Sequence, residues 1–277
     1  MKQYKYPVVL TIAGSDSGGG AGIQADLKTF SALGCFGTSA ITAITVQNTL
    51  GVTAIHSIPV DIVKGQIKAV IDDLKPQAIK IGMVHSAELA KGIAEILLKE
   101  PSIPVVLDPV MISTSGHKLI EDETVDVLTS HLFPLATVIT PNLDEAAVLT
   151  GVKLDNVDDM QKAAIKLLET GCRSVLVKGG HLKSKVLYDV FVDANGNELV
   201  FEGEFIQSNN VHGTGCTLSS AIGAYLARGE RLNVAISLAR DYIKEAIEAG
   251  KDVRTGEGNG PLNHFFNPQK LIKYEIL

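Results

Sequence analysis

The feature that most constrains the fold of this chain is a regular alternation of short apolar runs with longer amphipathic stretches. The apolar runs predict strands that are buried on both faces, at residues 8–13, 40–46, 78–81, 105–107, 138–140 and 174–177. The stretches between them show helical spacing at 61–74, 86–99 and 157–169, with Ser86 as an N-cap and Gly171 as a stop. Parallel strands need crossover connections of this kind. We therefore predict an α/β fold with three α/β/α layers, in which helices cover both faces of a mostly parallel sheet.

The alternation changes after the last of these strands. Residues 186–205 contain two β-rich runs separated by Asp193-Ala-Asn-Gly-Asn197, which predicts a hairpin and an antiparallel end to the sheet. Two helices are predicted next, at 217–227 and 233–249, and a glycine-rich tail follows. No linker or repeat divides the chain, so we expect one domain over residues 1–277.

Composition and charge exclude several classes of protein. The formal net charge is -6, and Lys and Arg are scattered, which does not suit a nucleic-acid phosphate backbone. No apolar run approaches the roughly 20 residues that cross a bilayer, and the first residues do not form a signal peptide. The three cysteines, Cys35, Cys172 and Cys216, have no metal-ligand spacing. We expect a cytoplasmic protein with reduced thiols and neither nucleic acid nor membrane as a partner.

A first glycine cluster occupies residues 14–22, between a predicted strand and a helix that begins near Ile23. Such a turn lets backbone N–H groups approach a ligand, but it is equally often glycine-rich for steric reasons. It lacks the GKS or GKT ending of a P-loop, and no acidic residue follows the next strand at the spacing of a dinucleotide site. Both the ligand-binding and the steric interpretation stay open.

A second cluster, His212-Gly-Thr-Gly-Cys-Thr, opens the predicted helix that follows the hairpin. The first N–H groups and the positive end of the helix dipole would converge on an anion there. Glycines at 213 and 215 let a phosphate approach, and Cys216 stands where a thiol pKa is expected to fall. We interpret the cluster as an oxyanion or phosphate cradle. The alternative is a tight turn with a buried cysteine that acts as a small hydrophobic residue.

Polar side chains follow three of the predicted strands. Asp108 and Lys178 each end a strand, and Asn142 and Glu145 lie three residues apart after another. In an α/β sheet, ligands collect outside the carboxyl ends of the strands. Asn142 and Glu145 could hold a hydrated magnesium ion, although a plain capping box explains them better when taken alone. Lys178 could contact polyphosphate, and a surface salt bridge is its commoner use.

Taken together, these segments resemble the hydroxymethylpyrimidine/phosphomethylpyrimidine kinase family. The resemblance runs in the family's order from Val8 to the tail at 256–265, through both glycine clusters, Lys80-Ile-Gly-Met83, Thr140-Pro-Asn and Lys178-Gly-Gly-His181. It implies a ribokinase-like fold and an ATP- and Mg²⁺-dependent kinase. Its substrates would be 4-amino-5-hydroxymethyl-2-methylpyrimidine and then its monophosphate, and the resulting pyrophosphate feeds thiamin synthesis. The family also implies a homodimer.

The resemblance implies a role for each candidate residue. The pyrimidine would lie among Ala21, Gln47, Met83 and Val110, with Asp26 nearby. The nucleotide would contact Lys178, Asn142 and Thr214, and the metal would be held by Asp108 and Glu145.

Cys216 stands where ribokinase-like sugar kinases carry an aspartate base. Either its thiolate accepts the hydroxyl proton, which is our hypothesis, or the base lies elsewhere. Gly213, Gly215 and Lys178 would then stabilise the transferring phosphoryl group.

Competing functions remain at this point. Pyridoxal kinases belong to the same superfamily, but Gln47 offers a donor and an acceptor that match an aminopyrimidine better than pyridoxal. Gln47 could instead only close its strand by bonding local backbone. A nucleotide-binding regulator or a Rossmann dehydrogenase could use a similar sheet. Cys216, Lys178 and the Asn142/Glu145 pair argue against the regulator, and the missing dinucleotide pattern argues against the dehydrogenase.

Overall fold

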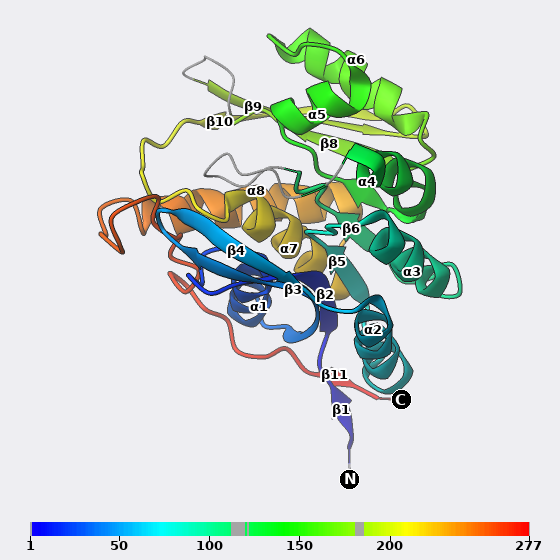
Figure 1. Ribbon diagram of the computed structural model, residues 1–277. Helices are drawn as coiled ribbons and strands as arrows, with labels where there is room; N and C mark the ends of the chain where they lie inside the picture. Colours follow the sequence, from blue (N-terminus) through cyan, green and yellow to red (C-terminus); the bar gives the residue numbers. More distant parts are fainter. Residues whose placement is uncertain (1, 112–119, 121, 181–185, 277) are drawn as a thin grey trace.

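The computed structural model describes residues 2–111, 120, 122–180 and 186–276. Within this part of the chain, nine strands form one sheet in the order β10-β9-β8-β7-β6-β5-β2-β3-β4 (Figure 1). Their bounds are β2 Val8–Asp16, β3 Phe36–Asn48, β4 Gly51–Ser57, β5 Ala78–Ile81, β6 Val105–Leu107, β7 Val138–Ile139, β8 Ser174–Lys178, β9 Val186–Asp193 and β10 Glu198–Glu204. All pairings from β8 across to β3 are parallel, whereas β4, β9 and β10 pair antiparallel at the edges. The predicted parallel sheet and its antiparallel hairpin are both confirmed.

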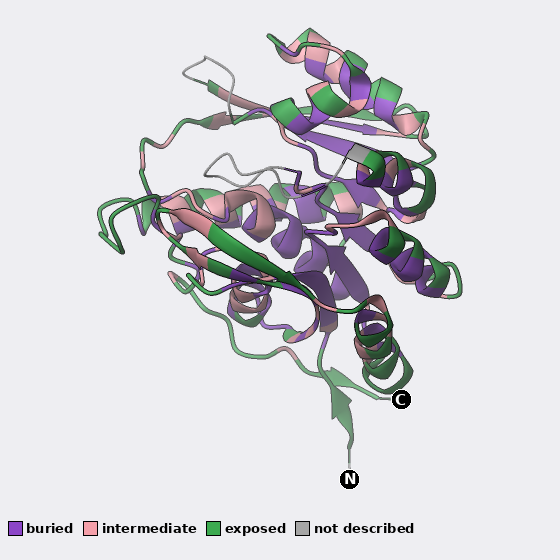
Figure 2. Cartoon of the chain, viewed as in Figure 1, coloured by how far each residue is buried: buried purple, intermediate pink, exposed green. Residues whose placement is uncertain are grey.

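Alternate side chains of the central strands enter hydrophobic clusters on opposite faces of the sheet. Val9 and Val106 pack with α1, α7 and α8, while Leu10 and Leu107 pack with α2, α3, α5 and α6. The bounds of these helices are α1 Gly22–Ala32, α2 Val60–Leu74, α3 Ala87–Leu97, α5 Leu143–Thr150, α6 Val157–Leu168, α7 Thr214–Ala227 and α8 Leu232–Glu248. The central strands are therefore buried on both sides, as Figure 2 shows. The three-layer α/β/α architecture is confirmed.

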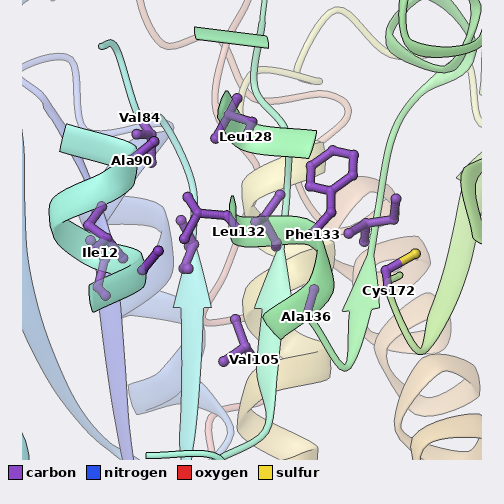
Figure 3. Packing of buried hydrophobic residues seen from close by; sticks show 14 of the residues in the cluster. Ile12, Val84, Ala90, Val105, Leu128, Leu132, Phe133, Ala136 and Cys172 are labelled. Atoms are coloured by element: carbon purple, nitrogen blue, oxygen red, sulfur yellow. The ribbon is translucent and has the colours of Figure 1, made fainter. Parts of the chain in front are cut away.

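The short segment between β6 and β7 fills the second of these clusters. It comprises α4 Asp122–Val127, a single π turn at Leu128–Leu132 and a 3₁₀ turn at Phe133–Leu135. Leu132 and Phe133 are fully buried, and Figure 3 shows both among the side chains of the cluster, with Ile12 and Val105. The sequence analysis did not predict these turns, which are too short to show a clear helical period.

The helix ends follow from identifiable residues. Ser86 caps α3 as predicted, because its Oγ accepts a hydrogen bond from the N–H of Leu89. Helix α7 begins at Thr214 rather than at the predicted 217, because Gly213 adopts φ 86° and serves as its N-cap. The glycines of the second cluster thereby belong to the first turn of the helix.

Two further elements lie outside the prediction. Strand β4 has mostly exposed residues of mixed polarity, so it gives no alternating signal, yet it pairs with β3 at the sheet edge. Strands β1 (Tyr4–Lys5) and β11 (Tyr274–Glu275) pair antiparallel and bring the two ends of the chain together (Figure 1). Among the helices of the described residues, none has the length and apolarity that crossing a membrane requires.

Candidate active site

The carboxyl ends of the parallel strands meet the N-terminus of α7. A Cβ placed on Gly215 would lie 3.2 Å from Lys178 Nζ, at the end of β8, and 3.4 Å from Asp108 Oδ2, just after β6. The cradle cluster and the predicted polyphosphate side therefore form one site. Their convergence, which was expected from the strand ends, is confirmed by the geometry.

Lys178 and Asp108 form an ion pair at the rim of this site. Lys178 Nζ lies 2.7 Å from Asp108 Oδ1, which also accepts a hydrogen bond from Thr140 Oγ1 at 3.0 Å. Burial alone would lower the pKa of Lys178, but the carboxylates of Asp108 and Glu145 outweigh it and raise that pKa above its ordinary value. Lys178 is therefore a fixed cation at neutral pH.

Asn142 and Glu145 form a complete capping box at the start of α5. Asn142 Oδ1 accepts from the Glu145 N–H, and Glu145 Oε2 accepts from the Asn142 N–H, both at 2.9 Å. The other carboxylate oxygen accepts from the Met111 N–H at 3.3 Å. Burial raises the pKa of Glu145 to about 7, with the Asp108 charge adding to the effect and Lys178 opposing it. The capping role is confirmed.

The magnesium role of these residues stays a prediction. Carboxylate oxygens suit Mg²⁺, and Asp108 and Glu145 act on each other electrostatically beside Lys178. Among the described residues, however, no three His, Cys, Asp or Glu side chains are grouped as a metal centre would need. The oxygen donors fit an ion that takes one or two protein carboxylates and completes its shell with water and phosphate.

Cys216 lies in the first turn of α7, and its side chain is a free, partly buried thiol. Burial, against an opposing effect of Lys80 and together with the carboxylates of Asp26 and Asp108, raises the pKa of the thiol to about 11. The predicted lowering of this pKa is therefore wrong for the free protein. Loss of hydration outweighs the helix end, so Cys216 is a neutral thiol at pH 7.

The first glycine cluster wraps around a carboxylate of its own. Asp16 accepts hydrogen bonds from the N–H groups of Gly18, Gly20 and Ala21 at 2.7 to 3.1 Å, and from His212 Nε2 at 2.9 Å. Burial would raise the pKa of Asp16, but the bonds from His212, Ala21 and Gly18 hold it below its ordinary value. These N–H groups are already used, so the steric interpretation of this cluster is the better one.

The residues predicted to surround the pyrimidine lie at the ends of four strands or in the segments that follow them. Gln47 closes β3, and Met83 follows β5, where it is buried beside Gly14 of the first cluster. Ala21 precedes α1, and Val110 lies two residues beyond Asp108, both half-buried. All four lie at the edge of the sheet that carries the cradle, and their contacts with substrate stay a prediction. Thr214 is the first residue of α7, on the same side.

The chain matches known proteins over most of its length. A family model described as phosphomethylpyrimidine kinase matches residues 16–263. The chain belongs to the phosphomethylpyrimidine kinase family. A hydroxymethylpyrimidine/phosphomethylpyrimidine kinase of Rhizobium meliloti is 50% identical over 260 residues, which cover 93% of this chain and 97% of the relative.

Two solved structures show the same fold. Phosphomethylpyrimidine kinase from Clostridium difficile is 49% identical, with a TM-score of 0.77 over 87% of this chain and 99% of its own. A pyridoxal kinase from Bacillus subtilis, solved as an ADP complex, is 37% identical, with a TM-score of 0.86 over 94% and 98%. This member of the phosphomethylpyrimidine kinase family is thus a phosphotransferase with the ribokinase-like fold.

Asp26, which the sequence suggested near the pyrimidine, is instead held in the interior of this kinase. Its carboxylate is fully buried and accepts from Lys80 Nζ at 2.8 and 2.9 Å, from Thr11 Oγ1 at 2.6 Å and from Ser220 Oγ at 2.6 Å. These donors saturate the carboxylate, so a direct contact with substrate has no support.

The sequence analysis missed three charged or polar partners of the site: Lys80, Asp16 and His212. Lys80 had a signal, because it is the one charged residue of the buried strand β5. Asp16 and His212 were quoted only as parts of glycine clusters, and their mutual contact joins those clusters. His181, quoted in the Lys178 motif, lies outside the described residues.

Proposed function

We propose that the protein transfers the γ-phosphoryl group of ATP to the hydroxymethyl group of 4-amino-5-hydroxymethyl-2-methylpyrimidine, and then to the resulting monophosphate, for thiamin synthesis. The observation that carries the proposal is the meeting of the α7 N-terminus with the Lys178–Asp108 pair, on the sheet edge that also holds Gln47. The names of the relatives support the choice of substrates. We assign the activity to one domain over residues 1–277.

The catalytic part of the proposal rests on positioning and charge. Lys178 places a cation beside the helix N-terminus, where the helix itself supplies no acceptor for the N–H groups of Gly215 and Cys216. These groups would stabilise the oxygens of the transferring phosphoryl, while Asn142 and Thr214 border the nucleotide. Bound Mg²⁺, held by Asp108 and Glu145, would neutralise phosphate charge.

Cys216 remains the proposed acceptor of the hydroxyl proton, although little of it is thiolate at neutral pH. With a pKa of about 11, only on the order of 10⁻⁴ of the thiol is ionised at pH 7. The transition state of phosphoryl transfer is loose, so the attacking hydroxyl need not lose its proton early. Cys216 can therefore accept the proton late in the transfer, and the fraction of it that is thiolate, which grows with pH, sets how often it can do so.

Pyridoxal is the second candidate substrate, favoured by the TM-score of 0.86 to the Bacillus subtilis pyridoxal kinase. Gln47 supports the pyrimidine instead. Its half-buried amide lies at the strand end that faces Asp16 and His212, and an amide can pair with the ring nitrogen and exocyclic amine of an aminopyrimidine. Pyridoxal has no such pair.

A coupled assay of ADP release, with product masses, tests the proposal on hydroxymethylpyrimidine, its monophosphate and pyridoxal, with and without Mg²⁺. We expect the two pyrimidines to be preferred. Gln47→Met should lower the ratio of kcat/KM for hydroxymethylpyrimidine over pyridoxal about 5- to 150-fold, because a polar edge of the substrate loses its partner. Gln161→Met, on the outer helix α6, is the matched control. A native preference for pyridoxal would establish the second candidate.

We also propose that the kinase works in the cytoplasm as a homodimer. Three free cysteines and a net charge of -6 fit the compartment. Exposed apolar side chains on the β3–β4 edge, Ile44, Val46 and Ile55, offer a surface for a second copy. Light scattering over a range of protein concentrations tests the dimer, and a constant monomer mass would reject it.

A further inference from the structure

His212 connects the predicted pyrimidine-recognition residue to the first glycine cluster. Its Nε2 lies 2.9 Å from Asp16 Oδ2 and 3.3 Å from the amide nitrogen of Gln47. The backbone of His212 is fixed by a hydrogen bond from its N–H to the Gly260 carbonyl, and its ring lies against Gly20, where a Cβ would be only 2.4 Å from Cδ2. The imidazole is therefore held in place from two sides.

Asp16 determines whether His212 Nε2 carries a hydrogen. A carboxylate only accepts hydrogen bonds, and Asp16 is ionised because the bonds from His212, Ala21 and Gly18 hold its pKa below the ordinary value. An unprotonated Nε2 at 2.9 Å would place a lone pair against this charge, whereas N–H to carboxylate is a strong, charge-assisted bond. His212 Nε2 therefore carries a hydrogen and donates it to Asp16.

This assignment conflicts with a Gln47 amide that turns its nitrogen toward His212. Two donors would then face each other at 3.3 Å. On the other side, Thr45 Oγ1 would need its single hydrogen twice, for the Ser15 carbonyl and for Gln47 Oε1, both at 3.0 Å. Rotating the amide by half a turn relieves both conflicts. Its nitrogen then donates to Thr45 Oγ1, and its oxygen faces the His212 N–H, which it shares with Asp16 as the longer branch of a bifurcated hydrogen bond. The orientation of a glutamine amide is properly chosen by such a network.

We infer that His212, anchored by Asp16, is a specificity-determining positioning residue that fixes the orientation of the Gln47 amide. With the amide so fixed, one N–H and one oxygen lone pair of Gln47 are left for a ligand, in a set order. A substrate edge with a ring acceptor beside an amine donor matches this order, and the reversed amide would oppose donor to donor. The inference rests on the proposed function, because it assumes that Gln47 binds the aminopyrimidine.

The test is a double-mutant cycle of His212→Phe with Gln47→Met, measured as kcat and KM for hydroxymethylpyrimidine, pyridoxal and ATP. Phenylalanine keeps the ring against Gly20 and removes the N–H. We expect His212→Phe alone to lower kcat/KM for hydroxymethylpyrimidine about tenfold, mainly through KM. The values for pyridoxal and the KM for ATP should stay within about twofold. In the Gln47→Met background, His212→Phe should change kcat/KM by less than about twofold.

Two variants accompany the cycle. His212→Gln can again donate to Asp16 and should restore part of the pyrimidine preference. His131→Phe, at an exposed histidine whose Nδ1 contacts the neighbouring Ser130 hydroxyl, is the matched control and should behave like the native protein. If thermal unfolding shows that His212→Phe does not fold, His212→Asn replaces it, since its amide is too short to reach Gln47.

The outcomes separate clearly. An equal cost in both Gln47 backgrounds, or an equal cost for pyridoxal and the pyrimidine, overturns the positioning role, because a merely structural histidine would act in that way. If the native protein does not phosphorylate hydroxymethylpyrimidine, the proposed function fails and this inference fails with it. A loss of kcat/KM that is seen for the pyrimidine alone, and only in the protein that keeps Gln47, supports the positioning role.

Discussion

Two lysine–aspartate pairs lie within electrostatic reach of Cys216, and they differ in how completely the protein surrounds them. Lys80 and Asp26 are both 0% exposed, and hydroxyl donors complete the shell of the carboxylate. Lys178 is 14% exposed and Asp108 3%. Among the described residues, close partners hold one oxygen of Asp108, while Ser219 Oγ lies 3.4 Å from the other.

This difference in exposure and partners indicates different roles. The Lys80–Asp26 pair holds the fold together, whereas the Lys178–Asp108 pair is open toward the proposed substrate site. Asp26, on α1, joins β2, β5 and α7 through Thr11, Lys80 and Ser220. Burial would lower the pKa of Lys80, but chiefly Asp26 raises it above its ordinary value, so the pair is charged. The Lys178 pair uses the same residue types, but leaves donors and acceptors toward the cradle. Counting the protein partners of a buried charge thus indicates its role better than residue type does.

The largest expected effect comes from breaking the closed pair. Lys80→Met leaves Asp26 buried without a counter-charge, which should lower the free energy of unfolding by about 3–5 kcal/mol. Urea denaturation measures it. Adding Asp26→Leu removes the second charge and should recover part of the loss. Equal destabilisation of the single and double variants would contradict a structural role for the pair.

Breaking the open pair should act more on rate than on stability. In Lys178→Gln the amide can still donate to Asp108, so we expect the free energy of unfolding to fall by less than about 3 kcal/mol, the lower end of the loss expected for Lys80→Met. The kcat should fall roughly 10²- to 10³-fold, because a preorganised cation beside the phosphates is lost. The preference among acceptor substrates should not change. A variant that unfolds easily but keeps its turnover would erase the distinction between the two pairs.

The sequence could predict the open pair but not the closed one. Asp108 and Lys178 each end a strand, and parallel strands deliver their carboxyl ends to one edge, so their meeting followed from the strand pattern. Asp26 and Lys80 lie mid-helix and mid-strand, and only the packing of α1 and α7 on the sheet brings them together. The fold itself was predictable because it depends on local periodicity. The edge strand β4 was not, because its exposed residues show no alternation.

Chemical detail was harder to predict than position. The place of Cys216 at a helix start was right, and the direction of its pKa was wrong, because sequence shows the helix end but not the loss of water around the sulfur. The sequence of the first glycine cluster likewise suggested backbone N–H groups that are free to bind a ligand. Only the folded turn reveals that the carboxylate of Asp16, inside the same cluster, accepts three of them.

Cys216 lies within electrostatic reach of both lysine–aspartate pairs, and its replacement tests its role in catalysis. Cys216→Ser should lower kcat on the order of 10²-fold while substrate binding persists. The thiol pKa of about 11 sets the pH dependence. If the deprotonated sulfur is the base, as we propose, kcat of the native enzyme should rise from pH 7 toward about 10, and the serine variant should lack this rise. Stopped assays across this range measure it. Alkylation of Cys216 should speed up over the same range and slow with saturating pyrimidine. A flat native profile would contradict the role of proton acceptor.

The smallest expected effect compares two helix caps, one beside the open pair and one remote from it. Asn142 and Asn156 each accept a hydrogen bond at 2.9 Å from the N–H three residues on, at the starts of α5 and α6. Replacing either by alanine should cost about 1 kcal/mol of unfolding free energy, because one N–H at the helix start loses its acceptor.

Only Asn142→Ala also loosens Glu145, whose carboxylate completes that capping box. It should therefore raise the Mg²⁺ concentration needed for half-maximal rate several-fold, whereas Asn156→Ala should leave it at the native value. Chemical denaturation and a magnesium titration of the assay give the two readouts. If both variants lose the same stability and neither changes the magnesium requirement, Asn142 and Glu145 are a cap alone, and the metal must be held by other groups at the sheet edge.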